Sequence, residues 1–275
     1  CEAPYSWQME LYKEKESCSY SCGRADYEFG HWRKKIPAGA AFETDKAFLY
    51  VGGGNVLAAC NALVHEQDRR LKVPESEREM PVLFNEYCTT WGCPSGENIR
   101  AILQAIRPFG IGYFVIDCGW YKPDDKGWGN ATGDWQQSAT LFPHGIRAVA
   151  DAIRAEGMVP GVWFEFEVAG RDSQAFSREE LLLKRDGTLI TSKNRRFFDL
   201  RKPEVDAYIS ERMTDFLIEN GFGYIKIDYN DTYGIGCDGA ESLGEGGRQV
   251  ADESLAWLDK LKAALPDIVI ENCSS

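Results

Sequence analysis

From residue 82 onward, short apolar runs alternate with longer stretches in which apolar residues recur every three or four positions. Runs of the first kind are typical of buried strands, and the longer stretches are typical of amphipathic helices. Pro203 suits the first turn of a helix, and Gly221 suits a C-terminal cap. Strands are therefore predicted at 82–85, 112–116, 159–164, 223–227 and 268–270, with helices at 97–108, 145–156, 203–220 and 248–265. A further short strand is expected at 196–200.

Strands that alternate with helices predict βαβ units and a parallel sheet. Five or six such units in one register favour a (β/α)8 TIM barrel over a doubly wound sheet. Because the count falls short of eight and only the letters ENCSS follow the last predicted strand, we expect an incomplete α/β barrel. The sequence also begins with Cys1 instead of Met, so we expect it to be part of a longer protein.

The first 78 residues have a different pattern. Apolar and polar residues alternate at 7–12, 27–29 and 47–51, which predicts half-buried strands, and 56–69 is predicted to form one helix. The segment 72–81 is polar and contains two prolines, as linkers between domains often do. We therefore expect two domains, at 1–78 and 79–275.

Composition narrows the classes of partner. The formal charge is −12 and the pI is near 4.9. We expect neither nucleic acid nor a membrane surface as a partner, because both require a basic face. No apolar run is long enough to span a membrane. Nine cysteines, spread along the chain without zinc-ligand spacing, predict no metal and reduced, mostly buried thiols in a cytoplasmic protein.

Acidic residues follow each of the five strands predicted for the parallel sheet. Burying a carboxylate is costly unless it is paired or solvated, so these acids are poor candidates for random surface charges. In a parallel barrel they converge at one mouth, where barrel active sites are built. For any single acid, capping a loop or a helix N-terminus is an equally good interpretation. The acids are Glu86, Asp117, Glu165, Glu167, Asp228 and Glu271.

Tryptophans also fall just after strand ends, at positions 91, 120, 128, 135 and 163. Their faces suit the C–H faces of sugars, although packing is the better explanation for any one of them. Two carboxylates in an aromatic-lined mouth suit glycoside hydrolysis. The GGGN segment at 52–55 lacks the Lys-Ser/Thr of a phosphate loop, and no GxSxG elbow is present.

Four motifs resemble glycoside hydrolase family 36, the bacterial α-galactosidases. They are YFVIDCGWY at 113–121, GDWQQSATLFPHGIRAVADAIRAEGMVPGVWFEFE at 133–167, FFDLRKPEVDAYI at 197–209 and YIKIDYND at 224–231. Together they cover roughly residues 80–275. The segment 36–54 resembles the end of the family's N-terminal β-sandwich, which implies a β-sandwich remnant before the barrel.

The resemblance implies roles for individual residues. Asp228 matches the nucleophile, which forms a covalent glycosyl-enzyme, and Lys226 lies two residues earlier on the same strand face. An arginine near the sugar corresponds to Arg196, with Arg195 as the alternative. The substrate-binding residues implied are Asp117, Trp120, Asp134, Trp135, Trp163, Glu165, Arg196, Lys226, Asn230 and Cys273. No cofactor is expected, the expected partner is an α-galactoside or small oligosaccharide, and a homo-oligomer is left open.

The sequence also departs from the family pattern. Cys118 replaces the second acid of an Asp-Asp pair, FEFE replaces Phe-Glu-Pro-Glu, and KID replaces Lys-Trp-Asp. The loss of an acceptor at Cys118 leaves open another α-linked sugar. ENCSS resembles the start of a stretch that leads to the acid/base residue, so we expect that residue beyond Ser275 and expect these 275 residues alone to be inactive.

Three other functions remain open. The barrel could transfer sugars, as raffinose and stachyose synthases do, and product analysis with an acceptor sugar separates transfer from hydrolysis. It could be a non-catalytic sugar-binding or regulatory barrel, which the Cys118 replacement suggests. As a last alternative, the strand-end acids could hold Mg²⁺ in an aldolase- or enolase-like enzyme, and activity would then be sensitive to EDTA.

Overall fold

The structure is a computed structural model that describes residues 4–274. These residues form two compact units. The first contains residues 4–78 and 235–252, and the second contains 79–234 and 253–274. Each unit is described by itself. The division of the chain into domains at 1–78 and 79–275, with a β-sandwich remnant in the first, stays a prediction.

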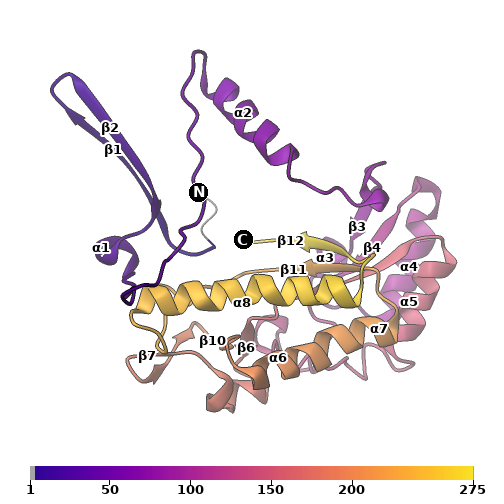
Figure 1. Ribbon diagram of the computed structural model, residues 1–275. Helices are drawn as coiled ribbons and strands as arrows, with labels where there is room; N and C mark the ends of the chain where they lie inside the picture. The colour runs from indigo at the N-terminus through magenta and orange to yellow at the C-terminus, as the bar shows by residue number, and fades with distance from the viewer. Residues whose placement is uncertain (1–3, 275) are drawn as a thin grey trace. The chain divides into compact units, whose positions relative to one another are not determined.

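The second unit is built on a five-stranded parallel sheet that curls into half a barrel (Figure 1). Its strands follow each other in space in their order along the chain, β3-β4-β5-β11-β12, without the reversal of order that defines a doubly wound sheet. The prediction of a partial TIM barrel is therefore confirmed, with five strands. They are β3 (Leu83–Asn85), β4 (Tyr113–Ile116), β5 (Val159–Phe164), β11 (Tyr224–Ile227) and β12 (Val269–Asn272).

Helices follow these strands where the periodicity predicts them. They are α4 (Gly96–Ile106), α5 (Ile146–Ala155), α6 (Pro203–Ile209), the π-helical segment η6 (Ser210–Asp215), α7 (Phe216–Asn220) and α8 (Leu243–Ala264). Pro203 lies in the first turn of α6, and Gly221 caps α7 with a left-handed φ of 69°. The apolar faces of α4 and α5 are buried, as the period of 3.6 requires.

The inner face of the half-barrel is filled by alternate residues of the strands. Tyr113, Val115 and Tyr224 form its core, with Leu83 and Val269 packed against them. The rings of Tyr113 and Tyr224 lie 5.0 Å apart. Gly161, which pairs with both Val115 and Tyr224, leaves the space that these side chains occupy. On the opposite face of the three central strands, the fully buried residues are Phe114, Ile116, Val162, Phe164, Ile225 and Ile227.

The strand expected at 196–200 exists as β10 (Arg195–Phe197), but it lies outside the barrel sheet. It pairs antiparallel with β6 (Val168–Gly170) and β9 (Thr191–Ser192). The period and composition of a segment cannot show whether it joins the barrel sheet or this small antiparallel sheet, because that depends on which strand it pairs with. The remaining short elements of the second unit are α3 (Tyr87–Thr90), η2 (Arg107–Phe109), η3 (Trp128–Asn130), η4 (Ala175–Ser177), η5 (Glu179–Leu181), β7 (Lys184–Arg185) and β8 (Thr188–Leu189). The 3-10 turn η1 (Glu75–Glu77) belongs to the first unit.

The first unit contains a hairpin of β1 (Trp7–Glu14) and β2 (Ser17–Arg24), a short α1 (Tyr27–Gly30) and α2 (Val56–Asp68). Two predictions are wrong here. Residues 27–29 are helical, because the Asp26 side chain accepts a hydrogen bond from Phe29 N at 3.0 Å and caps the turn. Residues 47–51 form no strand, because no described segment supplies the ladder of hydrogen bonds that a strand needs.

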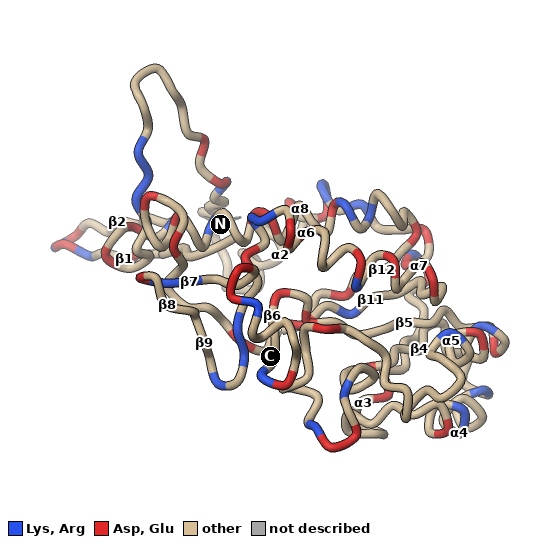
Figure 2. The backbone as a smooth tube through the Cα atoms, turned by 90° about the horizontal axis from the view of Figure 1, so that it is seen from below, with Lys and Arg blue, Asp and Glu red and all other residues tan. Residues whose placement is uncertain are grey.

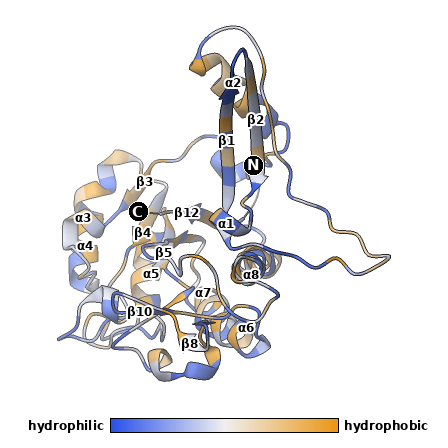
Figure 3. Ribbon diagram, turned by 90° about the vertical axis from the view of Figure 1, so that its left-hand side faces the viewer, coloured by the Kyte–Doolittle hydropathy of each residue, from blue (hydrophilic) through white to orange (hydrophobic). Residues whose placement is uncertain are grey.

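Hydropathy differs between the elements. The barrel strands are largely hydrophobic, whereas the hairpin mixes hydrophilic and hydrophobic positions (Figure 3). Acidic and basic segments alternate along the backbone (Figure 2). In the described part of the chain, no helix is both long and apolar enough to cross a membrane.

Candidate active site

The carboxyl ends of β4 and β11 bring an acid and a lysine together. Lys226 Nζ lies 2.9 Å from Asp117 Oδ2, and Asn85 Nδ2 donates to the same oxygen at 2.6 Å. Asp117 is only 3 % exposed, so the lysine supplies the countercharge that a buried carboxylate requires. Burial lowers the pKa of Lys226, but the hydrogen bond and charge of Asp117 outweigh this and raise it overall. Lys226 therefore stays a cation beside the Asp117 side chain.

Asp228 follows β11 directly, and its carboxylate accepts three hydrogen bonds. Trp163 Nε1 donates to Oδ2 at 3.2 Å, and Asn230 Nδ2 donates to the same oxygen at 2.8 Å. The backbone N–H of Tyr229 donates to Oδ1 at 2.9 Å. Donors on both oxygens hold the carboxylate in one orientation at the end of the strand. Tyr224, Lys226 and Asp228 share the inner face, because successive side chains of a strand alternate.

Glu165, at the end of β5, forms an ion pair with an arginine. Arg195 Nη1 lies 2.7 Å from Glu165 Oε1, and the backbone N–H of Asn230 donates to the same oxygen at 2.8 Å. Asn230 thus connects Glu165 to Asp228. Burial raises the pKa of Glu165, while Arg195 and Asn230 act in the opposite direction.

Two cysteines lie beside these groups. Burial raises the pKa of the Cys118 thiol, and the adjacent Asp117 carboxylate raises it further, so the thiol stays protonated. Cys273 follows β12 and is held by a 2.7 Å hydrogen bond from its backbone N–H to Ile227 O. Burial raises its pKa, and so does the neighbouring Asp228. Both therefore act as neutral thiols.

The predicted tryptophans have different positions. Only Trp163 contacts the Asp228 carboxylate. Trp120 is fully buried, donates from Nε1 to Trp163 O at 2.9 Å and stacks on Phe216 at 4.8 Å. Trp135 is 2 % exposed and stacks on Trp120 at 6.2 Å. Trp120 and Trp135 thus pack against Trp163, and Trp135 also lines a pocket at η6 and α7.

Asp134 and Arg196 are not brought to the cluster around Asp228. Asp134 accepts hydrogen bonds from the backbone N–H groups of Gln174 and Ala175, at 2.8 and 3.0 Å, and so holds a turn in place. Arg196 donates to Phe176 O at 2.7 Å and stacks on the Phe176 ring. Neighbouring residues of a strand point to opposite faces, so Arg195 reaches Glu165 and Arg196 does not. The geometry favours Arg195, the alternative that the sequence left open.

The other strand-end acids are engaged in internal hydrogen bonds. Glu86 accepts from Asp117 N at 2.8 Å and from the Thr90 hydroxyl, and burial raises its pKa to about 7. Glu167 accepts from Ser254 on α8, and burial raises its pKa to about 7 as well. Glu271 lies within β12 and accepts from Tyr224 at 2.8 Å. The strand-end acids therefore do not all converge on one cluster around Asp228.

Sequence reasoning missed Asn85 and did not assign Trp128 a role. Asn85 is the inward-facing residue at the end of β3, and its polar side chain after the apolar pair Leu83-Phe84 was the available signal. The Arg195 guanidinium lies 5.8 Å from the centroid of the Trp128 ring.

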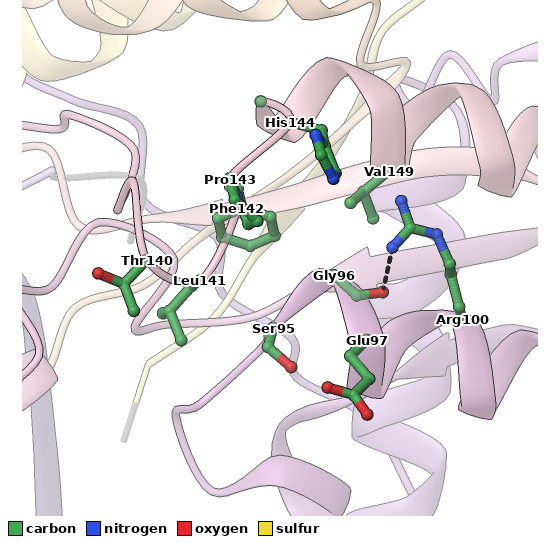
Figure 4. A pocket seen from close by; sticks show the side chains of 11 residues that line it. Ser95, Gly96, Glu97, Arg100, Thr140, Leu141, Phe142, Pro143, His144 and Val149 are labelled. Carbon is green, nitrogen blue, oxygen red and sulfur yellow. Dashed lines mark hydrogen bonds between the residues drawn. The ribbon is translucent and has the colours of Figure 1, made fainter.

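The pockets of the second unit include three that lie near the helices and strand ends described above. One, of about 200 Å³, lies where α4 and α5 begin, and there Arg100 Nη1 donates to Gly96 O at 3.4 Å (Figure 4). A second, of about 420 Å³, lies against η6 and α7. The third, of about 300 Å³, is lined in part by Arg195 and Asn230 and so adjoins the Asp228 cluster. Within residues 4–274, no group of His, Cys, Asp and Glu side chains is arranged to hold a metal ion.

Comparisons with known proteins agree with this arrangement. The chain is 28% identical over 263 residues to the α-galactosidase Mel36A of Lactobacillus acidophilus, covering 92% of this chain and 35% of that protein. It is 27% identical over 217 residues to an α-galactosidase of Escherichia coli, covering 76% of this chain and 29% of that protein. The chain thus spans about a third of the length of the curated relatives it matches.

Solved structures give the same result. The glycoside hydrolase family 36 α-galactosidase AgaA of Geobacillus stearothermophilus superimposes with a TM-score of 0.65 at 25% identity, covering 72% of this chain and 28% of that one. Variants of that enzyme have been solved in complex with 1-deoxygalactonojirimycin and with raffinose. The melibiase family model matches residues 41–275. The half-barrel, the strand-end cluster and these matches establish that the chain belongs to the melibiase family.

Proposed function

We propose that the full-length protein is a retaining, exo-acting α-galactosidase-like glycoside hydrolase with Asp228 as its nucleophile. The observation that carries this proposal is the Asp228 carboxylate, held by donors on both oxygens beside the Asp117–Lys226 pair. The proposal is supported by membership of the melibiase family and by the relatives of this chain, which are named α-galactosidases.

In this mechanism, Asp228 attacks the anomeric carbon and a general acid protonates the departing oxygen. The glycosyl-enzyme ester is then hydrolysed by water, so the configuration is retained. The donors Trp163 and Asn230 keep the carboxylate aligned for attack, which lowers the entropic part of the barrier. Trp120 and Trp135 act through Trp163, because they pack against its ring and backbone.

The Asp117–Lys226 pair is suited to hold sugar hydroxyls. A lysine ammonium has three donors, of which one contacts Asp117, and a carboxylate accepts several hydrogen bonds. A hydroxyl that accepts from Lys226 and donates to Asp117 satisfies both groups. Cys118, a weak donor in place of an acid, offers less to a neighbouring hydroxyl. The sugar taken at that position is therefore α-galactose or an α-linked relative that needs no acceptor there.

We infer that none of the strand-end carboxylates in residues 4–274 is the general acid. Glu165 is paired with Arg195, and Glu86 is fully buried and accepts from Asp117 N. Glu167 is held by Ser254 and Glu271 by Tyr224. A retaining pair requires two carboxyl groups about 5–5.5 Å apart across the sugar. The acid is accordingly supplied by another part of the protein, and residues 1–275 by themselves should not turn over an unactivated galactoside.

Trapping of the covalent intermediate tests the nucleophile. The full-length protein is treated with 5-fluoro-α-galactosyl fluoride, whose leaving group needs no acid, and the labelled peptide is identified by mass spectrometry. We expect the sugar on Asp228, and no label in Asp228→Ala. Asp125→Asn, an exposed acid, is the matched control and should label normally. A label on a different residue would overturn the assignment, and products formed with an added acceptor sugar would show transfer instead of hydrolysis.

We also propose a cytoplasmic location. None of the cysteines among residues 4–274 is in a disulfide bond, which suits a reducing compartment. A homo-oligomer of the full-length protein stays a prediction.

A further inference from the structure

Glu86 is a buried acid that the proposed reaction does not use. It directly follows β3 and is fully buried. It occupies the N-cap position of α3, but its side chain makes no capping hydrogen bond there. Oε1 instead accepts from the backbone N–H of Asp117 at 2.8 Å, and Oε2 accepts from the Thr90 hydroxyl. Because burying a carboxyl group is costly, the packing of α3 alone does not explain an acid at this position.

The contact with Asp117 takes the place of a backbone hydrogen bond between β3 and β4. Glu86 N donates to Val115 O at 3.3 Å, which is the last bond of this parallel ladder. In a regular parallel ladder the next bond would run from Asp117 N to Glu86 O. That carbonyl accepts instead from Thr89 N and Thr90 N, at 2.8 and 3.1 Å, because the chain turns into α3. The side chain of Glu86 therefore supplies the acceptor that the buried backbone N–H of Asp117 requires.

This hydrogen bond restrains the residue whose carboxyl group faces the proposed sugar site. Asp117 Oδ1 accepts from Cys118 N at 2.8 Å, and Oδ2 accepts from Asn85 Nδ2 and Lys226 Nζ at 2.6 and 2.9 Å. With its backbone N–H bonded to Glu86, Asp117 is held at the main chain as well as at both carboxyl oxygens. A shift of that main chain would carry the carboxyl group away from Lys226.

The nucleophile is held by a separate set of groups. The donors to Asp228 are Trp163, Asn230 and the backbone of Tyr229, whereas the hydrogen bonds of Glu86 lead to the sugar-binding pair. Loss of the Glu86 oxygen should therefore disturb the binding of the sugar more than the attack on the anomeric carbon. An interaction that contributes equally to the bound substrate and to the transition state changes KM and leaves kcat unaltered.

A neutral side chain can make the same contact. Burial is the main cause of a Glu86 pKa raised to about 7, and the Asp117 carboxyl acts in the same direction, while the hydrogen bonds from Thr90 and Asp117 N and the charge of Lys226 act against it. A carboxyl group keeps an acceptor oxygen when it is protonated, and so does the amide of glutamine. The glutamine N–H can donate to the Thr90 hydroxyl, which also accepts.

We propose that Glu86 is a positioning residue for substrate binding, which holds Asp117 in the orientation that meets Lys226 and the sugar. The assignment rests on the proposed function. It means that position 86 requires an oxygen acceptor of the right length, and that a negative charge there is not needed.

The test measures KM and kcat of the full-length protein on 4-nitrophenyl α-galactoside. Glu86→Met fills a similar volume but offers only a weak acceptor, so we expect KM to rise about tenfold or more while kcat falls less than about threefold. Glu86→Gln keeps the oxygen and should stay within about twofold of the unaltered protein in both constants. Glu204→Gln, at an exposed position of α6, is the matched control and should change neither constant.

Thr90→Val keeps the proposal testable if Glu86→Met folds poorly, as judged by circular dichroism. This variant removes the hydroxyl that donates to Oε2 and so leaves the Glu86 carboxyl group free to rotate. We expect KM to rise about threefold with kcat unchanged.

Three results would overturn the role of Glu86. They are an unchanged KM in both Glu86→Met and Thr90→Val, a loss of kcat without a change in KM, and equal losses in Glu86→Gln and Glu86→Met. The hydrolase proposal stands in each case if Asp228 takes the fluorosugar label. If the unaltered protein neither cleaves the substrate nor takes the label, the proposed function fails, and the role of Glu86 fails with it.

Discussion

At the residue scale, the carboxylates of the half-barrel differ in the partners that surround them. Asp117 has a lysine and Glu165 has an arginine, so burial is compensated by charge. Glu167 has only the hydroxyl of Ser254 and a distant like charge from Glu165. A buried carboxyl group is therefore held as an anion where a cation pairs with it, and binds a proton more readily where no cation does.

Glu167 makes stability depend on pH. Its pKa is raised from 4.5 to about 7 by burial, so the folded state binds more protons than the unfolded state between these values. The contribution of Glu167 to the free energy of unfolding is therefore largest below pH 4.5 and is lost as the pH rises toward 7. At 1.36 kcal/mol for each pKa unit, the loss amounts to about 3 kcal/mol. Glu167→Gln, which cannot ionise, should be more stable than the unaltered protein at pH 8 and should show a shallower loss between pH 5 and 8 in urea unfolding.

Glu204→Gln, on an exposed part of α6, serves as the control and should leave the pH dependence unchanged. An unaltered slope in Glu167→Gln would show that Glu167 is ionised throughout this range.

The Asp117–Lys226 pair is a second residue-scale prediction. Lys226→Met leaves Asp117 buried without its countercharge, which should cost about 3 kcal/mol in the free energy of unfolding. Adding Asp117→Asn removes the uncompensated charge, so the double variant should regain part of that loss. Urea unfolding of the single and double variants measures both. Equal stability of Lys226→Met and the unaltered protein would mean that the pair contributes nothing to folding.

At the element scale, the curvature and packing of the half-barrel depend on a glycine in β5. A Cβ at Gly161 would lie 2.9 Å from Val115 Cγ2 and 3.0 Å from the Tyr224 ring. Gly161→Ala should therefore destabilise the second unit by about 1–3 kcal/mol, because an overpacked core must shift. Thermal unfolding monitored by near-ultraviolet circular dichroism, which reports on the packed tyrosines, measures the effect.

Gly127→Ala is the matched control, since an added Cβ there meets nothing within 4 Å. It should leave the melting temperature close to that of the unaltered protein. A melting temperature of Gly161→Ala within a degree of that control would contradict the packing argument.

At the scale of the whole molecule, the two units differ in how much of their backbone is buried. The residues of β4 are all buried, and those of β11 nearly so, whereas no residue of α2 is buried. Local opening requires little energy where few apolar contacts are lost. Hydrogen exchange followed by mass spectrometry should show slow amides in β4, β5 and β11 and fast amides in α2. Equal protection of α2 and β4 would contradict this difference.

Local pattern was sufficient for the barrel elements and for part of the site. Apolar runs and helical periodicity depend on neighbouring residues, so the five strands and their helices were predictable. The inner position of Lys226 and Asp228 follows from a period of two. The family motifs pointed to Asp228, and the structure brings Trp163, Asn230 and Glu165 into one hydrogen-bonded cluster with it.

What the sequence by itself determined is therefore the order of elements, their inward faces and the class of chemistry at the strand ends. Only the tertiary structure decided which arginine reaches Glu165, because the pairing of β10 with β6 sets which face Arg195 occupies. It also decided that Trp120 packs in the core while Trp163 contacts Asp228. These outcomes depend on contacts between residues far apart in the chain, and period and composition carry no information about such contacts.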